Sequence, residues 1–514
     1  MSVPLYPTIA AVIERACHWK GGGEILCDRR ERLSGIELWR DANAIAAGLG
    51  SAGLQKGDVA AFLCASSARF AVTFIACQII GVVPSCLHTR QSRDNNAKTA
   101  DFVGARLLIA DAAHIEDATA IAEATGIRLM ALDGGAETSY ERLKSASDGH
   151  FVPGQAEPGD AALLLLSSGT TGKPKCVQHT QATLAATALM GPYNYRCFSP
   201  DDVTVVAMEP SFAAWIHTAL PFIAMRGRVV FDDRFDPGAF LEIVQREKIT
   251  LAPLVPTAWR MVLAAGPEDY SLGSLKSAFF SGEPGSASLV RELNERICRG
   301  VVTSYLSSEG GCASGIVADT GVLLNAGDAA STGRPVPGAN LRLIDPDGGL
   351  EDQVPTGAVG EIAITSASVA QGYFRDPSRS REKFADGWWR SGDLGRIDEN
   401  GALFIKGRLD NRINSGGIKV HAEEIEAALL GHPKVRQAGV VGVDDATWGQ
   451  RIEAHLVTET PPPSADDISE YCRNHSSLPK ALLPKAIHFH DSLPTGPTGK
   501  LYRRALITDD AGRD

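Results

Sequence analysis

The chain lacks closely spaced cysteines. Its ten cysteines are scattered between Cys17 and Cys472, and none of them forms a C-x-x-C pair. Zinc sites and disulfide frameworks usually show such regular spacing, so the pattern argues against both. Scattered thiols are typical of a reducing compartment, and we therefore expect a cytoplasmic protein.

Long runs of one charge and long uninterrupted apolar stretches are also missing. The chain carries 50 Lys and Arg against 61 Asp and Glu, a net charge of −11, with no basic run. This balance predicts that nucleic acid is not a partner. The most apolar window, residues 71–87, is interrupted by Thr73, Gln78, Gly81 and Pro84. We therefore expect no membrane span.

The first residues lack the pattern of a signal peptide. The segment MSVPLYPTIAAVIERA contains Glu14 and no cationic start, so none is expected. What the chain does have is length, because 514 residues are too many for one hydrophobic core. This length predicts two or more domains. Hydrophobic residues make up 44% and charged residues 22%, as in ordinary globular proteins.

Residues 163–179, LLLLSSGTTGKPKCVQH, stand out as a candidate ligand site. An apolar run followed by small polar residues predicts a buried strand that ends in a loop, where α/β proteins bind ligands. Glycines let the backbone approach an anion, hydroxyls add donors, and Lys173 and Lys175 add positive charge. A polyphosphate therefore fits this loop. A solvated strand-to-helix turn is the alternative that these residues alone leave open.

The loop differs from the P-loop of NTPases, which has four residues between its first glycine and Gly-Lys. Here only two residues separate Gly169 from Gly172, and Pro174 biases Lys173 away from helical geometry. SSGTTGKPK instead resembles the phosphate-binding signature of the adenylate-forming superfamily, which includes acyl-CoA and aryl-CoA synthetases, peptide-synthetase adenylation domains and luciferases. The resemblance implies an ATP-binding loop formed by Ser167, Ser168, Gly169, Thr170, Thr171, Gly172 and Lys173. Cys176 stands where the family usually has glycine, which we interpret as a packing substitution.

Residues 1–160 alternate helical and strand patterns, which predicts a parallel sheet with helices on both faces. The helix expected over residues 34–54 begins at Ser34, a typical N-cap residue. Further strands are expected over residues 203–208, 249–255 and 275–280, with a helix over residues 181–190. The fold class is therefore α/β, with two parallel-type α/β subdomains in the large N-terminal domain.

The next two segments carry parts of the family's nucleotide site. Residues 281–285, SGEPG, are similar to the turn whose backbone faces adenine, which implies ATP contacts from Ser281, Gly282 and Glu283. A plain β-turn is the alternative for this segment alone. VVTSYLSSEGG resembles the family's Tyr-Gly-x-Thr-Glu segment, which implies three roles. Tyr305 would stack on adenine, Ser308 would donate to phosphate or carboxylate, and Glu309 would hold Mg²⁺, for which a carboxylate is the expected ligand.

The resemblance also implies an acyl pocket. Residues 212–217, FAAWIH, are similar to the family segment that lines it. Leu306, where the family usually has glycine, would narrow it. We therefore expect an aryl or short-to-medium acid held by Phe212, Ala213, Ala214, Trp215 and Leu306. His217 beside apolar residues reads more simply as a hydrogen-bonded core histidine than as a functional one.

From residue 331 to about residue 409, short strands between Gly and Pro turns predict a β-rich subdomain. It contains WWRSGD, which matches the family motif whose aspartate binds both ribose hydroxyls, and this implies that Asp393 does so. The following segment, GRLD, resembles the boundary between the large and small domains. Arg408 would touch ribose or phosphate, and Asp410 would act as the hinge. The predicted domains are therefore residues 1–409 and 410–514.

The predicted small mobile C-terminal α/β domain carries two further matches. Ser415, Gly416 and Gly417 resemble the loop that lines the pantetheine tunnel of CoA ligases. PTGPTGK, at residues 494–500, resembles the terminal loop whose lysine is catalytic, which implies that role for Lys500. Ala481 and the next residue replace the tyrosine-lysine pair that is common in the family, a departure that would weaken nucleotide or CoA contacts.

The matches cover residues 30–504 in family order. They imply an acid-thiol ligase whose catalytic residues are Lys500, Ser308 and Glu309. Such an enzyme would use ATP, Mg²⁺ and coenzyme A, and its substrate would be a small carboxylic acid. A stand-alone adenylating enzyme that loads a carrier protein remains the alternative. A non-catalytic protein of the same fold that binds nucleotide remains a less favoured alternative. We expect a monomer or homodimer.

Overall fold

The computed structural model describes most of the chain. The described residues are 7–134, 139–145, 156–167, 175–195, 197–282, 285–311, 316–319, 331–475, 478–495 and 501–507. Among these residues, no helix is long and apolar enough to cross a membrane.

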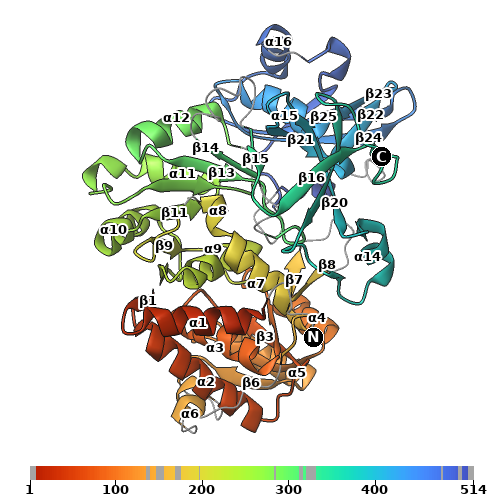
Figure 1. Ribbon diagram of the computed structural model, residues 1–514. Helices are drawn as coiled ribbons and strands as arrows, with labels where there is room; N and C mark the ends of the chain where they lie inside the picture. The colour runs from red at the N-terminus through yellow and green to blue at the C-terminus, as the bar shows by residue number, and fades with distance from the viewer. Residues whose placement is uncertain are drawn as a thin grey trace.

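The N-terminal part contains two large sheets (Figure 1). The seven-stranded sheet has the order β18 (Gly372–Tyr373), β8 (Lys175–Thr180), β7 (Ala161–Ser167), β4 (Val83–Cys86), β3 (Val59–Leu63), β5 (Ala105–Ala110) and β6 (Arg128–Ala131). Strands β7, β4, β3, β5 and β6 are parallel. Strands β8 and β18 are antiparallel additions at one edge, and the predicted phosphate loop connects β7 to β8.

The second sheet has nine strands. Their order is β15 (Arg334–Pro335), β14 (Ile316–Asp319), β13 (Val301–Ser304), β12 (Ser277–Phe280), β11 (Leu251–Leu254), β9 (Val203–Val206), β10 (Arg228–Phe231), β1 (Glu24–Cys27) and β2 (Arg32–Ser34). The strands from β13 to β1 are parallel. The expected strands over residues 203–208, 249–255 and 275–280 are confirmed as β9, β11 and β12, which are shorter.

Helices fill the space between the two sheets and cover their outer faces. The central layer consists of α1 (Ile9–Lys20), α2 (Gly35–Ser51), α3 (Ala68–Ile80), α7 (Gln181–Met190) and α9 (Ala213–Ala224), which share one core with strands of both sheets. Helices α4 (Arg93–Val103) and α5 (Ile115–Thr125) cover the far face of the seven-stranded sheet. The far face of the nine-stranded sheet is covered by α10 (Pro237–Glu247), α11 (Pro256–Ala264) and α12 (Ala287–Arg296). Short helices complete this part: α6 (Tyr140–Ser145), α8 (Pro192–Tyr195) and η1 (Pro267–Asp269).

Local sequence explains where these helices begin and end. Ser34 accepts a hydrogen bond from the backbone N–H of Glu37, whose carboxylate in turn accepts from the Ser34 N–H, so α2 starts with a complete capping box. The Ser67 hydroxyl caps α3 by accepting from the N–H of Phe70, and Gly81 ends this helix in the left-handed conformation that favours glycine. The expected helices over residues 34–54 and 181–190 are confirmed as α2 and α7.

The rest of the chain forms two five-stranded sheets, at the upper end of Figure 1. The first contains β16 (Ala339–Ile344), β17 (Val359–Ser366), β19 (Phe384–Ala385), β20 (Trp388–Ile397) and β21 (Leu403–Arg408), with helix α14 (Pro377–Lys383). The second contains β22 (Arg412–Ser415), β23 (Ile418–His421), β24 (Val435–Asp445), β25 (Gly449–Thr458) and β26 (Ala486–Phe489). Its helices are α15 (Ala422–Leu430) and α16 (Ala465–His475), and the 3₁₀ turns are η2 (Leu409–Asn411), η3 (Lys480–Leu482) and η4 (Arg503–Leu506).

This architecture confirms the predicted fold class, with parallel-type α/β sheets, a β-rich sheet and a separate C-terminal α/β sheet. The sheet that begins at β22 starts shortly after the predicted hinge. The domain boundary between residues 409 and 410 stays a prediction.

Candidate active site

Glu309 is the centre of a buried polar cluster. Its carboxylate is 7% exposed, and its Oε1 atom lies 2.6 Å from the Nζ atom of Lys175. The same oxygen accepts a hydrogen bond of 3.0 Å from the hydroxyl of Tyr373. Lys175 also lies over the Tyr373 ring, 4.6 Å from its centre. Lys175 and Tyr373 therefore hold the Glu309 carboxylate in a fixed position.

The electrostatics of the cluster keep Glu309 ionised. Burial alone would raise the pKa of its carboxyl, but the charge and hydrogen bond of Lys175 and the hydrogen bond of Tyr373 outweigh it. The net pKa shift is downward. A buried, ionised carboxylate is a suitable oxygen ligand for Mg²⁺.

Strand pairing explains how these distant residues meet. Lys175 begins β8, and Tyr373 lies in β18, which pairs antiparallel with β8 at Val177. Glu309 follows β13 after a turn, which His179 of β8 fixes through a 2.8 Å hydrogen bond to the carbonyl of Ser308. His179 is fully buried, and burial lowers its pKa, so the neutral ring donates this bond. The sequence analysis gave no role to Tyr373, nor to His179, although His179 closes the segment 163–179 that contains the predicted phosphate loop.

A second polar cluster forms around Tyr305, which lies four residues before Glu309. The Tyr305 hydroxyl donates a hydrogen bond to Oδ2 of Asp393. Nη1 of Arg408 lies 2.9 Å from Oδ1 of the same carboxylate. Asp393 and Arg408 are paired across β20 and β21. Burial and the Asp393 charge raise the pKa of Tyr305 well above its ordinary value, so its hydroxyl remains a donor.

A buried glutamate supports the turn before Asp393. Glu361 is fully buried in β17 and pairs with Arg390 at 2.5 Å. Its other oxygen accepts a hydrogen bond of 3.1 Å from the backbone N–H of Gly392. Gly392 has a φ of 73°, a left-handed conformation that favours glycine. The glycine of the WWRSGD motif is thus needed for the turn that presents Asp393.

Several predicted ATP-binding residues lie outside the described residues. These are Ser168, Gly169, Thr170, Thr171, Gly172, Lys173, Glu283 and the catalytic candidate Lys500. Ser167 ends β7. Ser281 and Gly282 follow β12, and Gly282 has a φ of 85°, a left-handed conformation that favours glycine. These roles stay predictions.

The residues of the predicted acyl pocket differ in burial. Phe212, Ala213 and Ala214 are half-buried at the start of α9, and Ala213 and Leu306 pack against the same central core. Trp215, by contrast, is 1% exposed and stacks parallel to Phe231 inside this core. The structure therefore places Trp215 among the aromatic residues that support α9. Its role in a pocket stays a prediction.

Phe212, a predicted pocket residue, has a buried histidine beside it that the sequence did not indicate. The ring of His88, which follows β4, lies 5.5 Å from that of Phe212. His88 is 3% exposed, and burial lowers its pKa. His217 is buried as well, and burial lowers its pKa to about 3. This burial agrees with the interpretation of His217 as a core residue.

The predicted hinge and tunnel residues lie in turns. Asp410 is in η2, the short 3₁₀ turn between β21 and β22. Ser415 ends β22, and Gly416 and Gly417 form the turn to β23 with φ values of 59° and 80°. The N–H of Gly416 donates to the carbonyl of Trp448. Their functional roles stay predictions.

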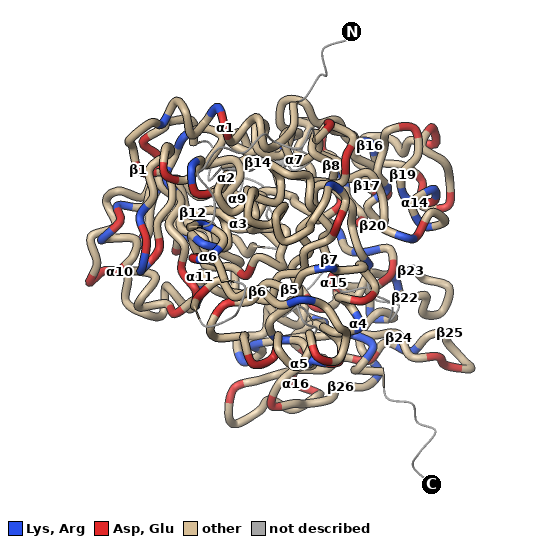
Figure 2. The backbone as a smooth tube through the Cα atoms, turned by 90° about the horizontal axis from the view of Figure 1, so that it is seen from below, with Lys and Arg blue, Asp and Glu red and all other residues tan. Residues whose placement is uncertain are grey.

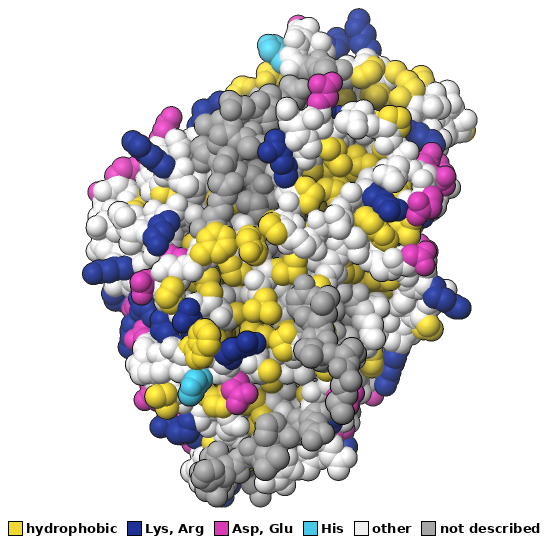
Figure 3. Space-filling model, in the orientation of Figure 1, with side chains coloured by type: hydrophobic (Ala, Val, Ile, Leu, Met, Phe, Trp, Pro, Cys, Tyr) yellow, Lys and Arg dark blue, Asp and Glu magenta, His cyan; other side chains and the backbone are white. Residues whose placement is uncertain are grey.

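The charged residues show no extended patch of one sign in the described parts of the two views. Figure 2 shows Lys and Arg interspersed with Asp and Glu along the outer loops and helices. Figure 3 shows hydrophobic side chains on the face turned to the viewer, with charges of both signs around them. This mixed distribution agrees with the presence of 50 basic and 61 acidic residues in the chain.

Comparisons with known proteins place this architecture in a class of nucleotide-using enzymes. ATP-bound MatB from Rhodopseudomonas palustris superposes with a TM-score of 0.86 at 25% identity, over 97% of this chain and 98% of that one. The o-succinylbenzoate CoA synthetase of Bacillus subtilis, in complex with its acyl-adenylate, gives 0.85 at 25% identity over 98% of both chains. The fold and the two clusters thus define an adenylate-forming enzyme.

Sequence relatives identify the family. The AMP-binding enzyme family matches residues 13–374, and the AMP-binding enzyme C-terminal domain matches residues 424–500. The 2-succinylbenzoate–CoA ligase of Bacillus licheniformis is 30% identical over 92% of this chain and 94% of its own length. A feruloyl-CoA synthase from an Amycolatopsis species is 31% identical over 92% of both. The chain belongs to the AMP-binding enzyme family, and the predicted cofactors ATP, Mg²⁺ and coenzyme A are confirmed at the level of this family.

Proposed function

We propose that this protein is an acid-thiol ligase that joins an aryl or short-to-medium carboxylic acid to coenzyme A, with ATP converted to AMP and pyrophosphate. The observation that carries the proposal is the spacing of the two clusters. Tyr305 donates to Asp393, which also pairs with Arg408, and it lies four residues before the buried Glu309. A nucleoside site and a metal-binding carboxylate are thereby held on one segment.

In the first half-reaction the substrate carboxylate attacks the α-phosphate of ATP, and pyrophosphate leaves. Asp393 accepts hydrogen bonds from the ribose hydroxyls, while Arg408 holds its other oxygen and adds positive charge near the phosphates. Ser308 donates to a phosphate or carboxylate oxygen. These fixed groups lower the barrier by positioning the reactants and by stabilising the negative charge that develops.

Glu309 fits the role of metal ligand because it is buried, ionised and oriented by two donors to one oxygen. Mg²⁺ held there and by ATP oxygens would neutralise charge on the phosphates. Lys175 is a cation beside the same carboxylate, and it would turn toward the phosphates as nucleotide binds. Lys500, on the terminal loop, would bind the developing charge during adenylate formation.

In the second half-reaction the thiol of coenzyme A attacks the acyl carbonyl carbon, and AMP leaves as the C–O bond of the mixed anhydride breaks. Rotation about Asp410, in the short turn between β21 and β22, would remove Lys500 and bring the Ser415–Gly416–Gly417 turn to the thiol. The half-buried Phe212 and Leu306 would border the acid. They favour a compact or planar acid over a long chain.

A carboxylate panel tests this proposal. Benzoate, cinnamate-type acids and straight-chain acids from acetate to palmitate are incubated with ATP, Mg²⁺ and coenzyme A, and acyl-CoA is detected by mass spectrometry. We expect acyl-CoA from aryl or short-to-medium acids only. AMP release without acyl-CoA, together with acylation of a phosphopantetheine carrier protein, would favour the carrier-loading alternative.

A further inference from the structure

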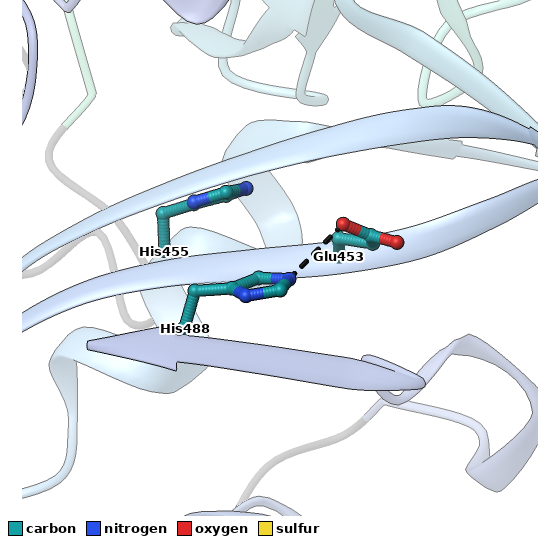
Figure 4. Close-up of side chains that lie close together, drawn as sticks. All are labelled: Glu453, His455 and His488. Carbon is teal, nitrogen blue, oxygen red and sulfur yellow. Dashed lines mark hydrogen bonds and ion pairs between the residues drawn. The ribbon is translucent and has the colours of Figure 1, made fainter. Parts of the chain in front are cut away.

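Three potential metal ligands lie together in the C-terminal sheet, far along the chain from Glu309. Figure 4 shows Glu453, His455 and His488 side by side, with the two imidazole rings one above the other. Glu453 and His455 belong to β25, and His488 belongs to β26. One ligand atom from each residue lies within 4.8 Å of the other two.

Strand register brings these residues to one face. Residues 453 and 455 are two apart in a strand and therefore point to the same side of the sheet. Strand β26 pairs in parallel with β25, and His488 lies directly beside His455. The ring centres of these two histidines are 4.7 Å apart. The opposite face of β25, with Ile452, belongs to the hydrophobic core of the domain.

The carboxylate of Glu453 is held in place from one side. Its Oε1 atom lies 2.5 Å from Nη2 of Arg451, and its Oε2 atom lies 3.1 Å from Nε2 of His488. Glu453 is only 5% exposed. Arg451 thus orients one oxygen and leaves the other beside an imidazole nitrogen. Such a support for a ligand carboxylate is typical of metal sites.

The surroundings of His455 give a second, independent indication of a ligand site. It is 4% exposed, and within the described part of the chain its Nε2 atom has no hydrogen-bond partner. Its Nδ1 atom lies 2.9 Å from Nε2 of His490, which fixes the ring orientation. Because Nδ1 is occupied by His490, Nε2 is the nitrogen that remains to bind an ion.

We propose that Glu453, His455 and His488 bind a divalent transition-metal ion of the zinc type. Two imidazoles and one carboxylate are a common donor set for such ions, at bond lengths of about 2.0–2.2 Å. Ligand atoms around a tetrahedral ion are then about 3.3 Å apart. The Glu453–His488 contact of 3.1 Å already matches this separation. The His488 side chain is 44% exposed, so its ring would have to rotate to complete the site.

The proposed metal site lies beside the segment that follows β26. Strand β26 leads into the segment in which Thr495 pairs with Leu501. Leu493 and Leu501 of this segment pack with Val441 of the neighbouring strand β24. Because an ion held by β25 and β26 binds only the folded sheet, it stabilises this part of the domain.

Cobalt titration tests the proposal with the full chain. The protein is stripped with a chelator, and Co²⁺ is added while the visible d–d absorption of nitrogen-ligated cobalt is recorded. We expect saturation at one Co²⁺ per chain and displacement by one equivalent of Zn²⁺. Glu453→Gln and His488→Ala should each weaken binding at least a hundredfold. Zn²⁺ should raise the Tm of the wild type but not of these variants.

Two matched controls separate this site from other metal ligands. His475→Ala removes an exposed histidine that stacks on Tyr471 in α16, and it should leave cobalt binding unchanged. Glu309→Gln removes the proposed Mg²⁺ ligand and should also keep the cobalt spectrum. Circular dichroism checks that each variant is folded. No stoichiometric cobalt spectrum, or equal binding by wild type and His488→Ala, would reduce the cluster to an ordinary ion pair and overturn the proposal.

Discussion

Replacing Lys175 by methionine should destabilise the protein in a way that depends on pH. Lys175 provides the cation beside Glu309, and both side chains are largely buried, at 18% and 9% exposure. The change leaves the Glu309 carboxylate with the Tyr373 hydroxyl as its remaining donor in the cluster. Removing one partner of a buried ion pair costs about 3 kcal/mol at neutral pH.

The sign of the pH dependence follows from the pKa of Glu309. In the wild type this pKa lies below its ordinary value. The paired carboxylate therefore stabilises the fold above pH ~4.3, and this contribution is lost as the pH falls through the lower, folded pKa. In Lys175→Met burial dominates and the folded pKa lies above the ordinary value. Stability then falls as the pH rises through that interval.

The destabilisation of the variant should accordingly shrink from about 3 kcal/mol at pH 7.5 to about 1 kcal/mol at pH 5. Calorimetry in EDTA measures the Tm of both proteins at each pH, so that no metal replaces the lysine. The double variant Lys175→Met/Glu309→Gln removes both charges and should recover most of the loss at pH 7.5. An equal Tm difference at both pH values, or no recovery in the double variant, would refute the reasoning.

Four further predictions address the nucleotide, the acid, the histidines and the terminal loop. Asp393→Asn weakens the hold on ribose and should raise the KM for ATP about tenfold in a pyrophosphate-release assay. Leu306→Gly opens the pocket and should add longer acids to those that give acyl-CoA, whereas an unchanged acid profile would contradict its role. Burial keeps His217 neutral in the folded protein, so the free energy of unfolding should decrease as the pH falls below the ordinary histidine pKa. His217→Asn should reduce that decrease by about 2 kcal/mol between pH 7 and pH 5 in denaturant titrations. Lys500→Ala should abolish adenylate formation and leave thiol transfer from supplied acyl-adenylate largely intact, and equal loss of both would contradict the proposed role.

The sequence predicted the elements that depend on local signals. The helix expected over residues 181–190 has the bounds of α7, and Ser34 caps α2 as expected. The family resemblance assigned Asp393 to the ribose and Arg408 to ribose or phosphate, but it did not predict the direct ion pair between them. Structure added the turn geometry, namely that Glu361 and the left-handed Gly392 hold this segment.

The contacts that the sequence did not indicate depend on long-range strand pairing. Tyr373 reaches Glu309 only because β18 pairs with β8, nearly two hundred residues earlier in the chain. Trp215 was assigned to the acyl pocket from its neighbours, yet the packing of α9 turns its ring into the core. The cysteine pattern argued against zinc and could not report on Glu453 and His488, whose proximity depends on the register of β25 and β26.

The most direct test of the central claim is acid-dependent exchange of labelled pyrophosphate into ATP in the absence of coenzyme A. Because adenylate formation precedes thiol transfer in the proposed reaction, wild-type protein with Mg²⁺ and an accepted aryl or short-to-medium acid should show exchange. Glu309→Gln should lower the rate at least a hundredfold. Absence of exchange with every acid of the panel, or exchange that is unaffected by Glu309→Gln, would contradict the account.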